Sequence, residues 1–461
     1  MSSLTIDQSR ATSWRSEFSA CLRLSIPLIL TNAIEMAMNL TSAAMIGRIN
    51  PEALGASTLG LALYNTCLMF GIGLTAAISP LVARERGSGA VATTDAIRRL
   101  VHAGFWNNII VVIPVWCLLW EAAPVLRLLG QESRLADEAA SYLHVMQWSL
   151  LPALIYLVLR SLLAALERPR WAVVTGVGAV VLNFVLNWLL IDGHAGLPAL
   201  GLLGSGLATF LSNLFMAGAL SVAVAVDPRF RKLRLFQGLG RVPWRACATL
   251  WRLGAPIGIG IVLEVGMFTA ATALVGHYDP VSLPAHAIAL QVASFTFMVP
   301  LGIAQAATVR VAGAAKRAAS ARAGWVALML GLGVALASAV VLVTVPEPII
   351  GLFIDPSEPG AQAVTRAAAL LLGIAGIFQL ADAAQVVLGG MLRGLQDTRM
   401  PMLIAMFSYW GVGLPLAFVL VINNATTGVW IGLTAGLFTV ALLLLGRWWV
   451  FSSGGRRPPI A

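Results

Sequence analysis

Apolar stretches long enough to cross a membrane recur along the whole chain. A helix of about 20 apolar residues spans the roughly 30 Å hydrocarbon core of a bilayer. The sequence lacks the short segments of alternating polarity that form a membrane β-barrel. It therefore predicts an all-α polytopic membrane protein with twelve transmembrane helices, at 22–46, 54–82, 100–120, 138–164, 171–191, 202–226, 250–275, 284–308, 323–345, 362–392, 400–422 and 428–450.

Composition and the placement of charge agree with a membrane-embedded chain. Hydrophobic residues make up 59% of it and charged residues 11%, against about a quarter charged in soluble domains. With both termini placed in the cytoplasm, the 30 Lys and Arg residues all lie on the cytoplasmic side except Arg48, Arg127, Arg134 and Arg366. This distribution is a positive-inside pattern, so the net charge of +10 reflects topology and no nucleic-acid partner is expected.

The two halves of the sequence are copies of one unit. A shift of 229 positions, without gaps, places Glu35 on Glu264 and the segment 23–27 on 252–256. Six predicted helices separate the copies, so both enter the membrane from the same side as parallel repeats. We expect two pseudo-symmetric six-helix lobes, 1–227 and 246–461, joined by a basic cytoplasmic linker at 228–245.

Duplicated helical bundles that enclose a cleft between them are typical of secondary transporters. The sequence shows no cluster of His, Asp or Ser typical of a membrane-embedded enzyme, so we expect no enzymatic activity. Its Cys and His residues show no metal-ligand spacing, so neither a structural metal nor a cofactor is expected. Pro27 and Pro256 interrupt helical hydrogen bonding inside predicted spans and are candidate hinges, although kinks without motion explain them equally well.

Three acidic residues lie in the interior of predicted spans, away from their ends: Glu35, Glu264 and Asp382. An ionised side chain near the middle of a span costs about 2.5–3.5 kcal/mol on insertion scales. We expect no Lys or Arg in the membrane interior, so a proton, a metal cation or a cationic substrate must neutralise these acids. Glu264 and Asp382 are the predicted cation-coupling residues, with transient Na⁺ binding at this pair, and Glu35 is a secondary candidate. The alternative is that each acid stays protonated and hydrogen-bonded as a structural link.

Amide and aromatic side chains inside the spans are further candidates. Asn183 and Asn187 are four residues apart on one helical face and are candidate secondary coupling residues. Hydrogen bonding between helices is the alternative interpretation of such amides. Aromatic faces and adaptable Met side chains suit flat lipophilic cations, although contact with lipid explains many of them as well. The predicted substrate cavity is lined by Gln379, Gln385, Tyr409, Trp410, Phe268 and Met36.

Several segments carry a resemblance to a known family through their order along the chain. They include Leu24-Ser25-Ile26-Pro27, Asn183 through Asn187-Trp188, Glu264-Val265, Asp382-Ala383-Ala384-Gln385 and Ser408-Tyr409-Trp410. In this order the chain resembles the multidrug and toxic compound extrusion (MATE) family, in particular its NorM-type branch, from Leu24 to about Val450. The resemblance implies twelve helices in two lobes, and export of organic cations in exchange for inward Na⁺ or H⁺.

The resemblance also implies roles for individual residues. The family's glutamate on helix 7 corresponds to Glu264, and its aspartate on helix 10 to Asp382. A tyrosine one turn before that aspartate is replaced by Phe378, and loss of this hydroxyl favours H⁺ slightly over Na⁺, which wants several oxygen ligands. The helix-1 aspartate aligns with Ser42, and Glu35, two turns earlier, is a candidate replacement for it.

We therefore expect a monomeric secondary antiporter of the bacterial inner (plasma) membrane. It would export lipophilic organic cations in exchange for inward H⁺ or Na⁺, by alternating access of its two lobes. The alternative is a flippase of the same superfamily that moves lipid-linked sugars or polysaccharide precursors, which would want buried Arg or Lys for an anionic pyrophosphate. A membrane-embedded enzyme or a structural scaffold is the alternative from another class.

Overall fold

A computed structural model of the protein describes all residues except 1–12, 89–92, 355–359 and 455–461. The described residues form helices and short connecting turns, without a strand. Arg10, Arg456 and Arg457, which contribute to the predicted charge pattern, lie outside the described residues. The all-helical fold class predicted from the sequence is confirmed.

Eleven helical stretches among the described residues are long and apolar enough to cross a membrane. The last of them, Arg399–Ser452, has 54 residues, about twice the length that one span needs. Its backbone leaves helical geometry at Ala425, with φ 49° and ψ −140°, so this stretch contains two spans. The structure therefore agrees with twelve membrane-spanning helices, as the hydropathy pattern predicts.

The described residues pack as two compact units. The first unit is Leu30–Gly258, and the second joins the described parts of Asp7–Ile29 and Ile259–Ala461. Two helices, α1 (Trp14–Ile46) and α11 (Trp244–Tyr278), contribute residues to both units. The first unit holds α2 (Pro51–Ala76), α3 (Ile78–Gly87), α4 (Thr93–Trp120), α5 (Ala122–Leu128), α6 (Ser133–Met146), η2 (Gln147–Ser149), α7 (Leu150–Ala165), α8 (Arg170–Ile191), η3 (His194–Gly196), α9 (Leu202–Val226) and α10 (Pro228–Arg231). The second holds η4 (Pro280–Ser282), α12 (Leu283–Gly313), α13 (Arg317–Thr344), α14 (Pro346–Ile350), α15 (Ala361–Gly394), α16 (Arg399–Met406), η5 (Phe407–Gly413) and α17 (Leu414–Ser452).

The internal repeat is visible in the helix boundaries. Several corresponding helices begin or end at positions related by the same shift that aligns the two halves of the sequence: α2 and η4 begin at Pro51 and Pro280, α8 and α16 begin at Arg170 and Arg399, and α7 and α15 end at Ala165 and Gly394. The turns that follow α7 and α15 both contain a non-glycine residue in left-handed conformation, Glu167 (φ 56°) and Gln396 (φ 65°). The duplication therefore extends to the backbone conformation of individual turns.

The packing units divide α1 and α11 at equivalent places. The division falls after Ile29 in α1 and after Gly258 in α11, in each case two residues beyond a proline inside the helix, Pro27 and Pro256. Proline removes a backbone hydrogen bond there, and the helix continues in both cases. These prolines thus lie where each helix passes from one packing unit to the other.

Glycine permits a close helix crossing at each of these places. A Cβ atom added to Gly73 of α2 would lie 2.1 Å from the Cα atom of Gly258 in the first unit. In the second unit, a Cβ atom added to the equivalent Gly302 of α12 would lie 2.8 Å from the backbone nitrogen of Ile29. Any side chain at either glycine would therefore push two helices apart.

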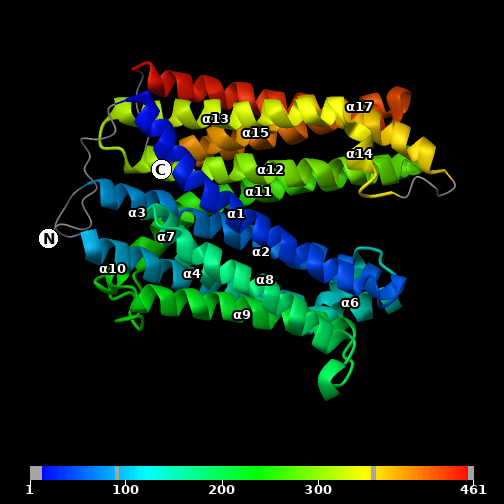
Figure 1. Ribbon diagram of the computed structural model, residues 1–461, viewed down its shortest axis with the longest axis horizontal. Coiled ribbons are helices and arrows are strands. Elements are labelled where there is room, and N and C mark those ends of the chain that lie inside the picture. Colours follow the sequence, from blue (N-terminus) through cyan, green and yellow to red (C-terminus); the bar gives the residue numbers. More distant parts are fainter. Residues whose placement is uncertain (1–12, 89–92, 355–359, 455–461) are drawn as a thin grey trace. The chain divides into compact units, whose positions relative to one another are not determined.

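Helix α15 lies at the centre of the second unit, against α12, α13 and α17 (Figure 1). Small residues let it approach α12 closely, because a Cβ atom on Gly390 would lie 2.4 Å from the carbonyl oxygen of Ala304. The hydroxyl of Thr308 donates to the Gly390 carbonyl at 2.8 Å, which reinforces the crossing. The polar residues that α15 carries are thereby held inside a packed unit.

Candidate functional site

One amide side chain joins the two predicted coupling acids in the second unit. Nε2 of Gln385 donates to Oε1 of Glu264 at 2.9 Å and to Oδ1 of Asp382 at 3.2 Å. Glu264 comes from α11, whereas Asp382 and Gln385 lie one turn apart on α15. The two acids therefore form one site, with a neutral donor between them.

Tyr409 completes this arrangement from a third element. Its hydroxyl donates to Oε1 of Gln385 at 3.3 Å, so both ends of the amide are bonded. Tyr409 belongs to η5, a π-helical segment, and is 1% exposed. The next residue, Trp410, is 42% exposed, and its indole nitrogen donates to the carbonyl oxygen of Leu263 at 3.1 Å. Segments of π-helix are frequent at functional sites, and this one directs consecutive aromatic rings to different surroundings.

The chemistry of this site suits a proton or a small cation. Its oxygen atoms belong to two carboxylates, one amide and one phenol, which are hard donors. Asp382 is 5% exposed, and a carboxylate at that depth lacks the water that would stabilise its charge. Among the described residues, no group of three or more His, Cys, Asp or Glu side chains is placed to hold a metal. A bound cation would therefore share the two carboxylates with neutral oxygens.

The expected absence of basic residues from the membrane interior was wrong. Arg160 lies within α7, five residues before its end, and is 6% exposed. Its Nη1 atom contacts Oε1 of Glu35 at 2.5 Å, and its Nη2 atom donates to Oδ1 of Asn32. Because α7 extends past Arg160, the guanidinium is inside the packed unit and needs a carboxylate partner. Glu35 is therefore neutralised by the protein itself.

Arg393 is a second basic residue that lies within a helix, although the charge pattern predicted it on the cytoplasmic side. It lies in the last turn of α15 and is half-buried. Its positive charge acts on Glu264, although no salt bridge between them is found among the described residues. Because the predicted span 138–164 contains Arg160, its position in that span could have identified it as an intramembrane residue. Arg393 falls one residue beyond a predicted span.

The other secondary candidates, Asn183 and Asn187, lie together in the first unit. Both are fully buried on α8. Nδ2 of Asn187 donates to Oδ1 of Asn183 at 3.0 Å, and the hydroxyl of Ser42 donates to the same oxygen at 3.1 Å. This cluster carries no charge, and Glu35, two turns earlier than Ser42 on α1, pairs with Arg160 instead.

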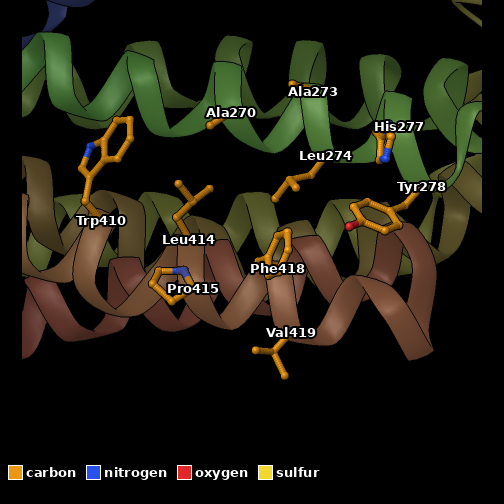
Figure 2. Close-up of a pocket in the computed structure, with 10 residues that line it drawn as sticks. All are labelled: Ala270, Ala273, Leu274, His277, Tyr278, Trp410, Leu414, Pro415, Phe418 and Val419. Carbon is orange, nitrogen blue, oxygen red and sulfur yellow. The ribbon is translucent and has the colours of Figure 1, made fainter.

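A pocket of about 700 Å³ opens beside the acid site in the second unit. Figure 2 shows side chains of α11 facing those of η5 and α17, with Trp410 at one end and Tyr278 near the other. The rings of Tyr278 and Phe418 meet edge to face, with centroids 6.3 Å apart. The full lining is Ala270, Ala273, Leu274, His277, Tyr278, Trp410, Leu414, Pro415, Phe418 and Val419.

Of the six residues predicted to line a substrate cavity, Trp410 lines this pocket. Gln385 and Tyr409 belong to the acid site, and Gln379 is buried, where its amide donates to the carbonyl oxygen of Ala293 at 3.1 Å. Phe268 packs edge-on against Phe378, with ring centroids 6.0 Å apart. Met36 lies on α1 in the first unit, half-buried. The α11 residues of the pocket were missed, although their spacing (270, 273, 274, 277) marks one helical face.

Comparison with known proteins identifies the family. The MatE family profile matches residues 27–189 and 256–419. A protein of Mesorhizobium japonicum named "Probable multidrug resistance protein NorM" is 44% identical over 440 residues, covering 94% of each chain. A protein of Brucella suis biovar 1 with the same name is 41% identical over 445 residues, covering 95% of this chain and 94% of the relative.

Among solved structures, the crystal structure of the eukaryotic MATE transporter AtDTX14 has the same fold. It superposes with a TM-score of 0.85 at 20% identity, covering 95% of this chain and 97% of that one. The two stretches matched by the profile begin at equivalent positions of the internal repeat, 27 and 256. The chain therefore belongs to the MatE family, in the branch whose curated members are named NorM.

Proposed function

We propose that this protein is a multidrug efflux antiporter, which exports lipophilic organic cations in exchange for inward H⁺ or Na⁺. The observation that carries the proposal is the pair of carboxylates, half-buried Glu264 and buried Asp382, bonded to one nitrogen of Gln385. Two acids so close in an apolar unit favour binding of positive charge. The name of both relatives, "Probable multidrug resistance protein NorM", agrees with such a substrate class.

The proposed cycle rests on competition for this site. When the acids are ionised, they favour a lipophilic cation in the protein. When H⁺ or Na⁺ from outside neutralises them, that attraction is lost and the drug leaves. Pumping requires each ligand to bind the two access states with different affinity. The packing transitions beside Pro27 and Pro256 support these residues as the hinges of alternating access.

A proton is the favoured coupling ion in this proposal. The donor set consists of the two carboxylates, the Gln385 amide and the Tyr409 hydroxyl. Phe378, one turn before Asp382, offers no oxygen and packs instead against Phe268 and Trp430. Since Gln385 presents its nitrogen to both acids, Na⁺ would gain the amide oxygen only after the side chain rotates. A proton needs no such rearrangement.

The aromatic pocket is the proposed contact surface for the substrate in the second unit. Trp410 lines the pocket and directly follows Tyr409, which is bonded to the acid site. Aromatic faces attract organic cations, and the described lining carries no fixed negative charge that would bind every cation equally. We place the protein as a monomer in the bacterial inner membrane with both termini cytoplasmic.

The flippase alternative requires a basic group free to bind pyrophosphate. The most deeply buried arginine among the described residues, Arg160, already contacts Glu35 and Asn32. The charge of Arg393 interacts electrostatically with the carboxyl group of Glu264, which opposes an anionic ligand there. Both observations favour a cationic substrate.

Transport by purified protein in vesicles tests the proposal. A pH gradient and a Na⁺ gradient are imposed separately, and uptake of ethidium is followed by fluorescence. We expect uptake against the concentration gradient with the pH gradient. Uptake that requires Na⁺ alone would replace H⁺ by Na⁺ in the proposal, and no uptake with either gradient would contradict antiport.

A further inference from the structure

The two membrane glutamates of the repeat have different partners. Glu35 and Glu264 are equivalent in the repeat, and each lies eight residues after a proline, Pro27 or Pro256. Each faces the last turns of an equivalent helix, α7 or α15, and these two helices end at equivalent residues. Arg160 of α7 corresponds by the same shift to Gly389 of α15. The same backbone framework thus carries a guanidinium in one unit and a hydrogen atom in the other.

In the first unit this guanidinium is fully committed to its partners. The Arg160 side chain is 7% exposed and that of Glu35 is 33% exposed. Nη1 contacts the Glu35 carboxylate, and Nη2 donates to the Asn32 side chain. Tyr156 is the other titratable group close to this pair, and its hydroxyl donates to the carbonyl oxygen of Ala172. Removal of Glu35 alone would leave the Arg160 charge inside the unit without its carboxylate partner.

In the second unit the equivalent place holds no cation in direct contact, as far as the described residues show. Glu264 accepts a hydrogen bond from the neutral amide of Gln385. The positive charge that acts on Glu264 is that of Arg393, one turn beyond Gly389. Its Nη2 atom lies 3.5 Å from a Cβ atom built on Gly389. Its charge acts on Glu264 without an ion pair among the described residues. Glu264 is therefore left for a cation that can come and go.

We propose that Arg160 is a built-in cation, which permanently occupies in the first unit the position that the coupling ion visits in the second. Glu35 then takes up no coupling ion, and the number of ions exchanged per substrate is set by Glu264 and Asp382. This inference rests on the proposed antiport. A tethered partner has a high effective concentration, so a free ion cannot compete for Glu35 while Arg160 is present.

Chemical labelling of carboxyl groups tests this directly. Dicyclohexylcarbodiimide modifies protonated carboxyl groups in apolar surroundings, and mass spectrometry of the full-length protein in vesicles locates each adduct. In the wild type we expect adducts at Glu264 or Asp382 and none at Glu35 above the background of Glu35→Gln. In Arg160→Gln we expect adducts at Glu35 to rise by about tenfold or more, the effect of about 1.4 kcal/mol. Arg160→Lys keeps a positive charge and should keep Glu35 unlabelled.

The double variant Glu35→Gln/Arg160→Gln removes both charges together, which leaves no unpaired buried ion. It should fold, and its ratio of ions to drug molecules transported should equal that of the wild type. A changed ratio would overturn the proposal. So would strong labelling of Glu35 in the wild type, a result that needs no variant to fold.

The antiport and the role of Arg160 fail separately in these experiments. If the wild type moves no drug under either gradient, the proposed function is contradicted, whatever the labelling at Glu35. If gradient-driven transport depends on Glu264 and the wild type is nevertheless labelled at Glu35, the antiport stands and the built-in cation is refuted.

Discussion

Gln385 donates to Glu264 at 2.9 Å through the same nitrogen atom that it shares with Asp382. The amide thereby stabilises the ionised form of both acids without adding a charge. Since its oxygen accepts from Tyr409, the orientation of the amide is held from the opposite end. Gln385 is therefore the residue through which protonation of one carboxylate affects the other.

Replacement of Gln385 by Leu should therefore impair drug binding more than replacement of Tyr409 by Phe. Gln385→Leu removes two hydrogen bonds to charged groups, each worth about 1.5–3 kcal/mol, so the acids hold their protons more tightly. We expect drug affinity at neutral pH to fall by about tenfold or more. Tyr409→Phe removes only a bond to the neutral end of the amide and should have a smaller effect. Ethidium binding titrations compare the two, and the opposite order would contradict the assigned role of Gln385.

The absence of a side chain at Gly389 is predicted to keep Glu264 free of an internal ion pair. In Gly389→Arg, a guanidinium placed as in the first unit should pair with Glu264 and slow ion-coupled transport by about tenfold or more. Gly389→Ala is the matched control, because its Cβ would meet only Arg393 Nη2, at an ordinary contact of 3.5 Å. Vesicle transport rates, with thermal unfolding in detergent to verify folding, check this pair. Wild-type transport in a folded Gly389→Arg variant would contradict the equivalence of the two positions.

Gly73 should be intolerant of any side chain. A Cβ atom there would lie 2.1 Å from Cα of Gly258, so Gly73→Ala forces α2 and α11 apart and should lower the free energy of unfolding by about 1–3 kcal/mol. Gly260→Ala is the control, because nothing lies within 4 Å of its added Cβ. Alanine in a helix interior should stabilise that variant by up to about 1 kcal/mol. Equal stability of the two variants would refute the close crossing.

A pH-dependent contribution to stability is expected at Asp279, between α11 and α12. Oδ2 of Asp279 accepts from the Thr426 hydroxyl at 2.7 Å and from its backbone N–H at 3.3 Å. Burial acts to raise the pKa of Asp279, but hydrogen bonds from Thr426 and Ser282 outweigh it and hold the pKa below its usual 3.8. A lowered folded-state pKa adds stability that is present above pH 3.8 and is lost as pH falls through the folded value.

The free energy of unfolding, measured between about pH 6 and pH 3, should show this loss in the wild type. The loss should be smaller in Asp279→Asn, which has no carboxylate to protonate. Thr426→Val, which removes the hydroxyl donor, should flatten the profile in the same direction. An unchanged pH profile in Asp279→Asn would show that the carboxylate contributes nothing.

Much of the fold was predictable because a bilayer leaves few choices. Backbone groups in lipid must bond within the chain, so each long apolar stretch becomes a helix. The offset that pairs Glu35 with Glu264 also predicted which helices correspond. At the site, Asp382 and Gln385 are three residues apart in the sequence, a spacing that agrees with their shared face on α15.

The parts that were not predictable depend on contacts between distant segments. That Gln385 of α15 also bonds Glu264 of α11 is a contact between residues 121 positions apart, which no local pattern encodes. The pairing of Arg160 with Glu35 joins residues 125 positions apart. The positive-inside rule, which placed Arg160 on the cytoplasmic side, takes no account of such partners. The π-helical geometry of η5, which carries buried Tyr409 and exposed Trp410, has no signature in residue composition.

The most direct test of the central claim is gradient-driven ethidium transport by Glu264→Gln and Asp382→Asn in vesicles. Asp279→Asn serves as the control, since it removes an acidic residue of the second unit that lies outside the membrane spans. We predict that both neutral variants, folded and inserted, lose coupled transport by about tenfold or more, while the control keeps the wild-type rate. Wild-type rates in both Glu264→Gln and Asp382→Asn would contradict the account.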